Sequence, residues 1–339
     1  MSKGQGRKTK SIYSITITVI LMIAFALANA NAQYNGECWA ADYYNVLKID
    51  GSGQAVAIQG FSQPLSLSVN SKDGSCWVAD TDAIRVRKLS AAGQELAMLD
   101  GAADPKLFAP DAKSLTNPAS VTVDPRDGSC WVATMNVICK FSSDAKQLLV
   151  KPGFNEPIVA INPKNGDCWV ADSSNSKVLK LSADGNQAWV KQIAGVTQPK
   201  SLSVNPADGT CWILDAFTHK LVKMSSDGQV LVEAATAAAG TAIMSTAVTA
   251  SSDGGCWVAV MIDMMNDQVI KLSADGKPVL QAGGFAMPSG LSFDPKDNGC
   301  WVADTNGGRI VKLSSAGQEV VNIGGLSQPK VVMVAYPAQ

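Results

Sequence analysis

The sequence is poor in the residues that usually build metal and redox sites. It contains a single histidine, His219, and aromatic residues account for only 6% of it. No Cys-x-x-Cys spacing occurs among its eight cysteines, so the common ligand pattern of a zinc site is missing. We therefore predict no bound metal and no cofactor.

The chain also lacks a large excess of charge of either sign. It has 28 lysines and arginines against 29 aspartates and glutamates, which gives a formal charge of -1. Proteins that bind a phosphate backbone present a basic surface. We therefore expect no nucleic-acid partner.

Long apolar runs are absent except near the N-terminus. Four basic residues precede a 14-residue apolar stretch at 15–28, and small residues follow in Ala28-Asn-Ala30 and Ala30-Asn-Ala32. This is the organisation of a cleavable signal peptide, and the run is short for a bilayer that needs about 20 residues. We predict a signal peptide over residues 1–32, with cleavage after Ala30 or Ala32. Its removal leaves a charge of about -5 and no membrane span. The protein is then secreted, or lies in the periplasm or cell envelope.

What the sequence does contain is a sevenfold repeat. The pair Cys-Trp begins a similar strand in every copy, and the last copy, 288–325, shows the whole unit. The pair occurs at 38–39, 76–77, 130–131, 168–169, 211–212, 256–257 and 300–301. Valine-rich runs separated by Asp-Gly and Ser-x-x-Gly turns predict four antiparallel strands in each copy.

A four-stranded repeat of about 40–45 residues is typical of a propeller blade. The first copy lacks its own first strand, whereas the chain ends with a spare one at 329–335. That strand can close the ring on the first blade and leave no free sheet edge there. We predict that residues 33–339 form one all-β domain, a seven-bladed propeller, with six blades as the alternative.

The hairpin between the second and third strands of a copy sets a register. Placing Trp169 opposite Lys180 also places Asp172 opposite Lys177, and four other copies follow the same rule. The rule pairs Asp80 with Arg85, Asp215 with Lys220, Asp304 with Arg309 and Trp131 with Lys140. We interpret the aspartate pairs as local structural contacts rather than as acid–base catalysts.

The unit resembles the repeat of the NHL propellers. In the last copy Trp301-Val-Ala-Asp304 is followed by Arg309-Ile310, and the NHL repeat has an aromatic-Val-Ala-Asp strand followed by Arg-Ile. The chain departs from that pattern by its Cys-Trp pair and by losing the aspartate at Thr134 and Val260. The resemblance implies a propeller over nearly all of 34–336. It leaves the function open, because that superfamily includes protein- and RNA-binding platforms, lyases and lactonases.

The cysteines are predicted to be free. Seven of them hold the same place in seven blades, so neighbours lie about one sheet-packing distance, roughly 10 Å, apart, whereas a disulfide needs Cα atoms within about 7 Å. Cys139 takes an apolar position opposite Val132. We predict eight buried thiols. We also predict seven tryptophans packed between blades, each with a lysine stem or ammonium group near its ring.

Variation among the copies concentrates on one face, where the loops after the second and fourth strands lie. Two enlarged segments, 100–117 and 261–267, belong to this face, and loops on a rigid scaffold are the usual place for function. The candidate binding residues lie in these loops or directly before the first-strand prolines. They are Gln63, Phe108, Asn117, Glu156, Gln198, His219, Met264, Met265 and Gln328.

The channel mouth offers few groups suited to catalysis. Glu156 is the one carboxylate among the residues before the prolines, and Asn117 is the other candidate, whereas metal-assisted hydrolysis needs more ligands. We therefore predict a binding scaffold for a protein or a glycan rather than an enzyme. The alternatives are a metal-assisted lyase or hydrolase at the channel mouth, and a structural component of the envelope.

Overall fold

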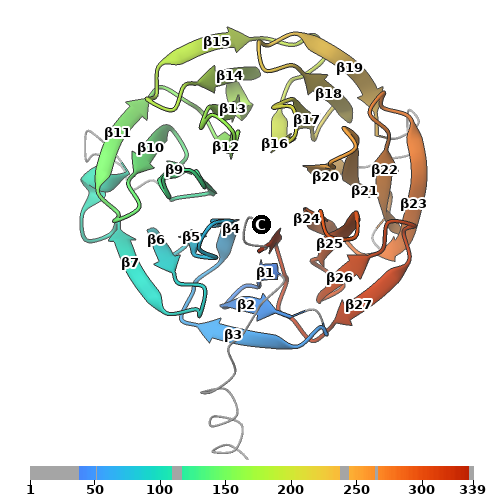
Figure 1. The fold of residues 1–339 in the computed structure, drawn as a ribbon, viewed down its shortest axis with the longest axis horizontal. Helices are drawn as coiled ribbons and strands as arrows, with labels where there is room; N and C mark the ends of the chain where they lie inside the picture. The colour runs from blue at the N-terminus through green and yellow to red at the C-terminus, as the bar shows by residue number, and fades with distance from the viewer. Residues whose placement is uncertain (1–37, 51, 109–116, 237–243, 264–265, 336–339) are drawn as a thin grey trace, which may run out of the picture. The chain divides into compact units, whose positions relative to one another are not determined.

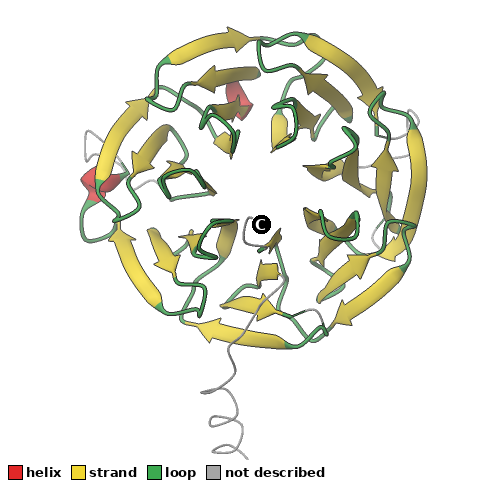
Figure 2. Ribbon diagram, viewed as in Figure 1, coloured by secondary structure: helices red, strands yellow, loops and turns green. Residues whose placement is uncertain are grey.

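Seven four-stranded antiparallel sheets form a ring in the computed structural model (Figure 1). The structure describes residues 38–50, 52–108, 117–236, 244–263 and 266–335. The predicted signal peptide lies outside these residues. In the described part, helix is limited to two short 3-10 turns, Pro105–Leu107 and Ser173–Asn175 (Figure 2).

The first four blades begin at the strand that closes the ring. Blade 1 contains β28 (Val331–Val334), β1 (Cys38–Ala41), β2 (Asn45–Ile49) and β3 (Ala55–Gln59). Blade 2 contains β4 (Pro64–Val69), β5 (Cys76–Asp80), β6 (Arg85–Leu89) and β7 (Glu95–Asp100). Blade 3 contains β8 (Ser120–Val123), β9 (Cys130–Ala133), β10 (Val137–Phe141) and β11 (Gln147–Pro152). Blade 4 contains β12 (Pro157–Ile161), β13 (Cys168–Asp172), β14 (Lys177–Leu181) and β15 (Gln187–Lys191).

The last three blades have the same order. Blade 5 contains β16 (Pro199–Val204), β17 (Cys211–Asp215), β18 (Lys220–Met224) and β19 (Val230–Ala235). Blade 6 contains β20 (Met244–Ala250), β21 (Cys256–Met261), β22 (Asp267–Leu272) and β23 (Pro278–Phe285). Blade 7 contains β24 (Pro288–Asp294), β25 (Gly299–Asp304), β26 (Arg309–Leu313) and β27 (Glu319–Ile323). The first strand of each blade is the inner strand at the channel, and the fourth is the outer strand (Figure 1).

Seven blades and the closing strand are confirmed. β28 pairs with β1 in an antiparallel register that places Trp39 opposite Met333, so the two ends of the described chain share blade 1. The hairpin register is confirmed as well, because Trp169 lies opposite Lys180 and Asp172 opposite Lys177. The predicted pairs in blades 2, 3 and 7 also hold.

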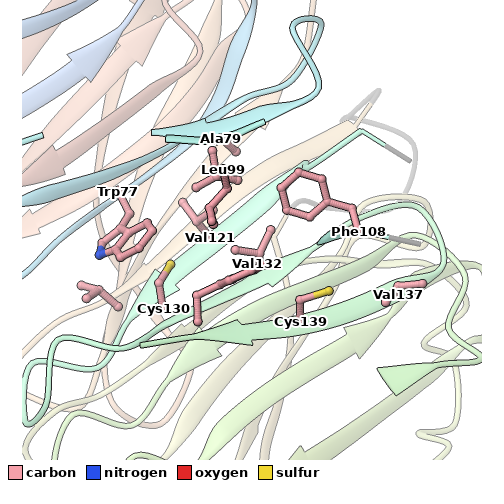
Figure 3. Close-up of a cluster of buried hydrophobic side chains, with 12 residues drawn as sticks. Trp77, Ala79, Leu99, Phe108, Val121, Cys130, Val132, Val137 and Cys139 are labelled. Carbon is pink, nitrogen blue, oxygen red and sulfur yellow. The ribbon is translucent and has the colours of Figure 1, made fainter. Parts of the chain in front are cut away.

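The core consists of seven clusters, one at each joint between neighbouring blades. In every cluster the tryptophan of one blade packs near the cysteine of the next, because adjacent residues of a strand point to opposite faces. At the joint of blades 2 and 3, Trp77 lies beside Cys130 and Val121 (Figure 3). The seven tryptophans of the repeat are at most 1% exposed, and burying an aromatic side chain removes about 150–250 Å² from water.

In five of the seven blades, the lysine opposite the tryptophan binds a carbonyl group of the following blade. In six blades the ammonium group lies 5.2–5.7 Å from the tryptophan ring centroid. Several of these groups also donate to a carbonyl of the following blade, as Lys88 does to Ser143 O at 2.7 Å and Lys140 to Ala183 O at 2.7 Å. In blade 4, Lys180 donates to Ser226 O and pairs with Asp167.

The aspartate at the end of the second strand forms ion pairs and hydrogen bonds with loops of the loop-bearing face. Asp80 binds Arg85 at 2.6 Å and Asp304 binds Arg309 at 2.7 Å, as expected for local pairs. Asp215 differs in number of backbone contacts, because it accepts several N–H groups, including those of Thr197 and Gln198, whereas Asp80 and Asp304 each accept one. Its expected partner, Lys220, pairs with Glu233 at 3.0 Å.

Hydroxyl groups of the inner strands connect neighbouring blades along the channel. Ser66 and Ser68 Oγ accept the N–H groups of Val121 and Val123 at 3.1 and 2.9 Å. Equivalent bonds run from Ser120 and Thr122 to blade 4, from Ser201 and Ser203 to blade 6, from Thr249 to blade 7 and from Ser292 to blade 1. These bonds satisfy backbone N–H groups at the open edge of five inner strands.

Two joints lack these hydroxyls. At the joint of blades 4 and 5 the corresponding residues are Ile158 and Ala160 of β12, and at the joint of blades 1 and 2 they are Val331 and Met333 of β28. Hydroxyl groups of the inner strands therefore connect neighbouring blades at five of the seven joints.

We expect the hydroxyl contacts to contribute measurably to stability. Ser68→Ala removes the acceptor of the Val123 N–H and should lower the free energy of unfolding by about 1 kcal/mol. Ala160→Ser offers the missing acceptor to blade 5 and should raise stability or leave it unchanged. Urea unfolding of both variants measures the two effects, and a destabilised Ala160→Ser protein together with a neutral Ser68→Ala protein would contradict the assignment.

All eight cysteines are free and buried, as predicted. Burial raises the pKa of six of the seven repeat thiols, those after blade 1, well above the usual range and that of Cys139 to about 12, because desolvation disfavours the thiolate. An aromatic disulfide reagent at pH 8 should therefore find no reactive thiol in the native protein and eight after denaturation. Rapid reaction of the native protein would show that the joints open.

Candidate functional site

A cavity of about 510 Å³ lies on the loop-bearing face, where blades 2, 3, 4 and 5 meet the channel. Its charged and amide groups come from Asn117, Glu156 and Lys200, and Met135 also lines it. Ala119, Pro157 and Ile158 supply apolar lining. We call this space the mouth cavity. Its size is within the range of about 300–1,000 Å³ that is usual for ligand pockets.

Glu156 and Lys200 form the charged pair of the mouth cavity. Lys200 Nζ lies 2.6 Å from Glu156 Oε2, and Ser174 Oγ donates to the same oxygen at 3.1 Å. The Lys200 hydrogen bond and charge, followed by the Ser174 bond, lower the pKa of Glu156 below its ordinary value. The side chains are 44% and 36% exposed, so both remain open to a ligand.

The pair owes its geometry to two neighbouring inner strands. Glu156 directly precedes the proline that begins β12, and Lys200 follows the proline that begins β16. Glu156 has a φ of +53°, in the left-handed region that non-glycine residues seldom occupy. The same conformation occurs at Gln63, Met287 and Gln328, so it belongs to the entry of the inner strand and not to Glu156 alone.

Two threonines of the mouth cavity already use their hydroxyl protons. Thr81 Oγ1 donates to Pro118 O at 2.8 Å and Thr134 Oγ1 to Val137 O at 3.2 Å. The groups left to a ligand are the Glu156 carboxylate, the Lys200 ammonium, the Asn117 amide and the apolar lining. Such a mixture of a few polar groups with apolar surface is common in sites that bind polar organic molecules.

The central channel forms a second space of about 460 Å³, and it shares Lys200 and Ile158 with the mouth cavity. Its wall is built by the seven inner strands, whose residues facing it are mostly Ser, Thr, Val and Leu. Lys200 and Lys330 are its charged lining residues, and Asp and Glu are absent from the lining within the described part of the chain.

The predicted binding residues do not all reach this site. Asn117 and Glu156 line the mouth cavity. Gln63, Gln198 and Gln328 lie at the entries of other inner strands, where Gln198 and Gln328 are exposed and Gln63 is half-buried. Met264 and Met265 lie outside the described residues.

Phe108 is a correction to the predicted set. Its side chain is 1% exposed and packs edge-on against Phe141 with the ring centroids 6.1 Å apart. It fills the joint of blades 2 and 3 beside Leu99. The large apolar residue of a long loop is therefore a core residue here, and it does not form part of a binding surface.

His219 is half-buried at the joint of blades 5 and 6. Its Nδ1 lies 3.5 Å from Ser245 Oγ, which is 2.6 Å from Thr236 Oγ1. Ser245 is fully buried, and the His219 carbonyl accepts from Thr236 N at 3.1 Å. His219 thus connects two blades, away from the mouth cavity.

Several residues of the loop-bearing face were not singled out from the sequence. Tyr44, Met135 and Phe217 follow second strands and are 58%, 63% and 78% exposed. At the place of Phe217, blades 4 and 7 carry Ser174 and Asn306. That contrast between copies was visible in the sequence. The pairing of Lys200 with Glu156 was not, because it joins residues of different blades.

Comparisons with known proteins show the fold. No family model and no curated protein matches the sequence. A functionally unknown protein from Desulfotomaculum acetoxidans is similar in structure, with a TM-score of 0.70 at 13% identity over 89% of this chain and 99% of that one. A periplasmic gluconolactonase from Pseudomonas aeruginosa gives 0.68 at 14% identity over 88% and 99%. Virginiamycin B lyase from Staphylococcus aureus gives 0.61 at 14% identity over 77% and 84%.

The described residues contain neither a cluster of metal-binding side chains nor a membrane-spanning helix. No group of three or more His, Cys, Asp or Glu side chains is placed to hold a metal ion there. None of the helices in the same residues is long and apolar enough to cross a bilayer.

We expect the carboxyl group of Glu156 to titrate below the ordinary glutamate value, and Lys200→Met to raise its pKa. Because the folded-state pKa is lowered, the contact stabilises the fold above the ordinary pKa and is lost as the pH falls through the lowered one. Carbon-detected NMR titration measures this, with Lys220→Met as the control, since it breaks the separate pair with Glu233. Equal Glu156 titration in all three proteins would contradict the assignment.

Proposed function

We propose that the protein is a secreted propeller of the NHL type that binds a glycan on its loop-bearing face. The mouth cavity carries this proposal. It is concave, and it offers a carboxylate, an ammonium group and an amide over apolar lining. Sugar rings present hydroxyl groups that can both donate and accept, together with apolar C–H faces, so a lining of this mixed kind suits them.

Exposed aromatic residues on the same face support the proposal. Phe217 and Tyr44 both stand in loops after second strands, and Phe217 is 78% exposed. An aromatic side chain that stays exposed to water contributes little to the stability of the fold. It can stack on a ligand, however, with a contact worth about 1 kcal/mol. Tyr43 lies edge-on to Tyr44 at 4.8 Å between ring centroids, which limits the freedom of the Tyr44 ring.

A protein ligand fits these observations less well. Protein interfaces bury roughly 800 Å² on each partner, and their centres are enriched in aromatic residues and methionine. Here the exposed aromatic side chains are separated by blades with small polar residues at the same place, such as Ser174 and Asn306. Lyase and lactonase activities occur among proteins of similar fold, but fold alone does not carry an activity over.

Binding is tested on an oligosaccharide array, followed by calorimetry with the best ligand. Phe217→Ala should weaken the affinity by about fivefold, the loss of one stacking contact, and Glu156→Gln should weaken it as well. Leu231→Ala is the control, since Leu231 is exposed on the outer strand of the same blade. Equal affinity for all variants would show that the glycan binds neither at Phe217 nor at the mouth cavity. Binding of a purified protein that depends on Phe217, with no oligosaccharide bound, would replace the glycan with a protein.

A further inference from the structure

We infer that the end of the central channel on the loop-bearing face is an anion site, which takes a carboxylate or phosphate group of a ligand. This inference goes beyond the proposed glycan, because it concerns the channel and holds for any ligand that carries such a group. It rests on the charge of the channel wall and on the hydrogen-bond donors that the wall presents.

The sign of the charge is reversed in the channel relative to the rest of the protein. The chain carries more acidic than basic residues, yet the described lining of the channel contains Lys200 and Lys330 and neither Asp nor Glu. Both lysines follow the proline that precedes or begins an inner strand, in blades 5 and 1. A cleft lined by charge of one sign with low-dielectric walls concentrates the potential that a ligand meets.

The two lysines differ in how far they are neutralised. Lys200 pairs with Glu156 at 2.6 Å. Among the described residues, by contrast, no carboxylate oxygen lies within ion-pair distance of Lys330. An ammonium group carries three donors, so Lys200 retains two after binding Glu156. The channel mouth therefore holds one uncompensated positive charge and one shared charge.

The hydroxyl groups of the wall add further donors. Ser66, Ser68, Ser201 and Ser203 each accept a backbone N–H of the next blade. A hydroxyl that accepts one bond still has its own proton to donate. In the part of the chain that the structure describes, these four protons have no protein acceptor, so they are available to an oxygen of a ligand or to water.

Backbone donors occur at the two joints that lack hydroxyls. By the register of the repeats, the N–H groups of Leu67 and Val69 in β4 correspond to those of Val121 and Val123 in β8, which bind Ser66 and Ser68. The neighbouring strand β28 offers the apolar side chains of Val331 and Met333 there. Donors thus line the wall at these joints also, and an anion that accepts several of them is favoured over a neutral group.

The test uses small anions as probes at constant ionic strength. Inorganic phosphate and malonate represent the phosphate and carboxylate sources, and glycerol is the neutral control. Calorimetry should detect both anions and not glycerol, and the stronger of the two anions identifies the source. Lys330→Met should weaken anion binding by about tenfold, as expected for the loss of one charged hydrogen bond, while Lys191→Met on an outer strand should leave it unchanged.

A second variant keeps the test independent of how well Lys330→Met folds. Glu156→Gln removes the competing carboxylate from Lys200 and should strengthen anion binding. The inference is overturned if neither anion binds, if glycerol binds as well as they do, or if Lys330→Met and Lys191→Met bind equally. Since Glu156→Gln is expected to weaken the glycan and strengthen the anion, failure of one proposal is distinguished from failure of the other.

Discussion

The whole ring depends on packing between blades, because a single four-stranded sheet cannot bury its own faces. Each tryptophan of the repeat fills the joint to the following blade, and the adjacent cysteine, pointing the other way, meets the tryptophan of the preceding blade. The small thiol leaves room for the large ring. The identical Cys-Trp pair therefore serves both joints of every blade, and none of the seven can change size without a matching change in its neighbour.

Most of the fold could be predicted from the sequence, because residues that recur at the same position in seven copies occupy the same kind of environment in each blade. The opposition of Trp169 and Lys180 follows from residues within one hairpin, and β28 closes the ring because the first copy lacks one strand. Phe108 was misjudged for the opposite reason. It belongs to a segment with no counterpart in other copies, so nothing in the repeat shows that it fills a joint.

The candidate site was only half visible in the sequence. Glu156 stands out as a carboxylate where other copies have amides or methionine, whereas Lys200 becomes important only through its contact with Glu156 across a joint. Pairings between blades depend on how far one inner strand is shifted along the next, and hairpin registers do not contain that information. The exposed Phe217 is an intermediate case, because comparison of the copies marks it as different but does not say which way it points.

The pairing of β28 with β1 has a consequence for the order of events during synthesis. The first three strands of blade 1 are synthesised before the other six blades, but β28, which completes their sheet, is synthesised after those blades. Until then the edge of β1 is open, and the joints on either side of blade 1 are incomplete. Contacts between residues so far apart in the chain form slowly, and exposed edges favour aggregation. Closure of the ring therefore waits for β28, because a chain without this strand leaves the edge of β1 unpaired.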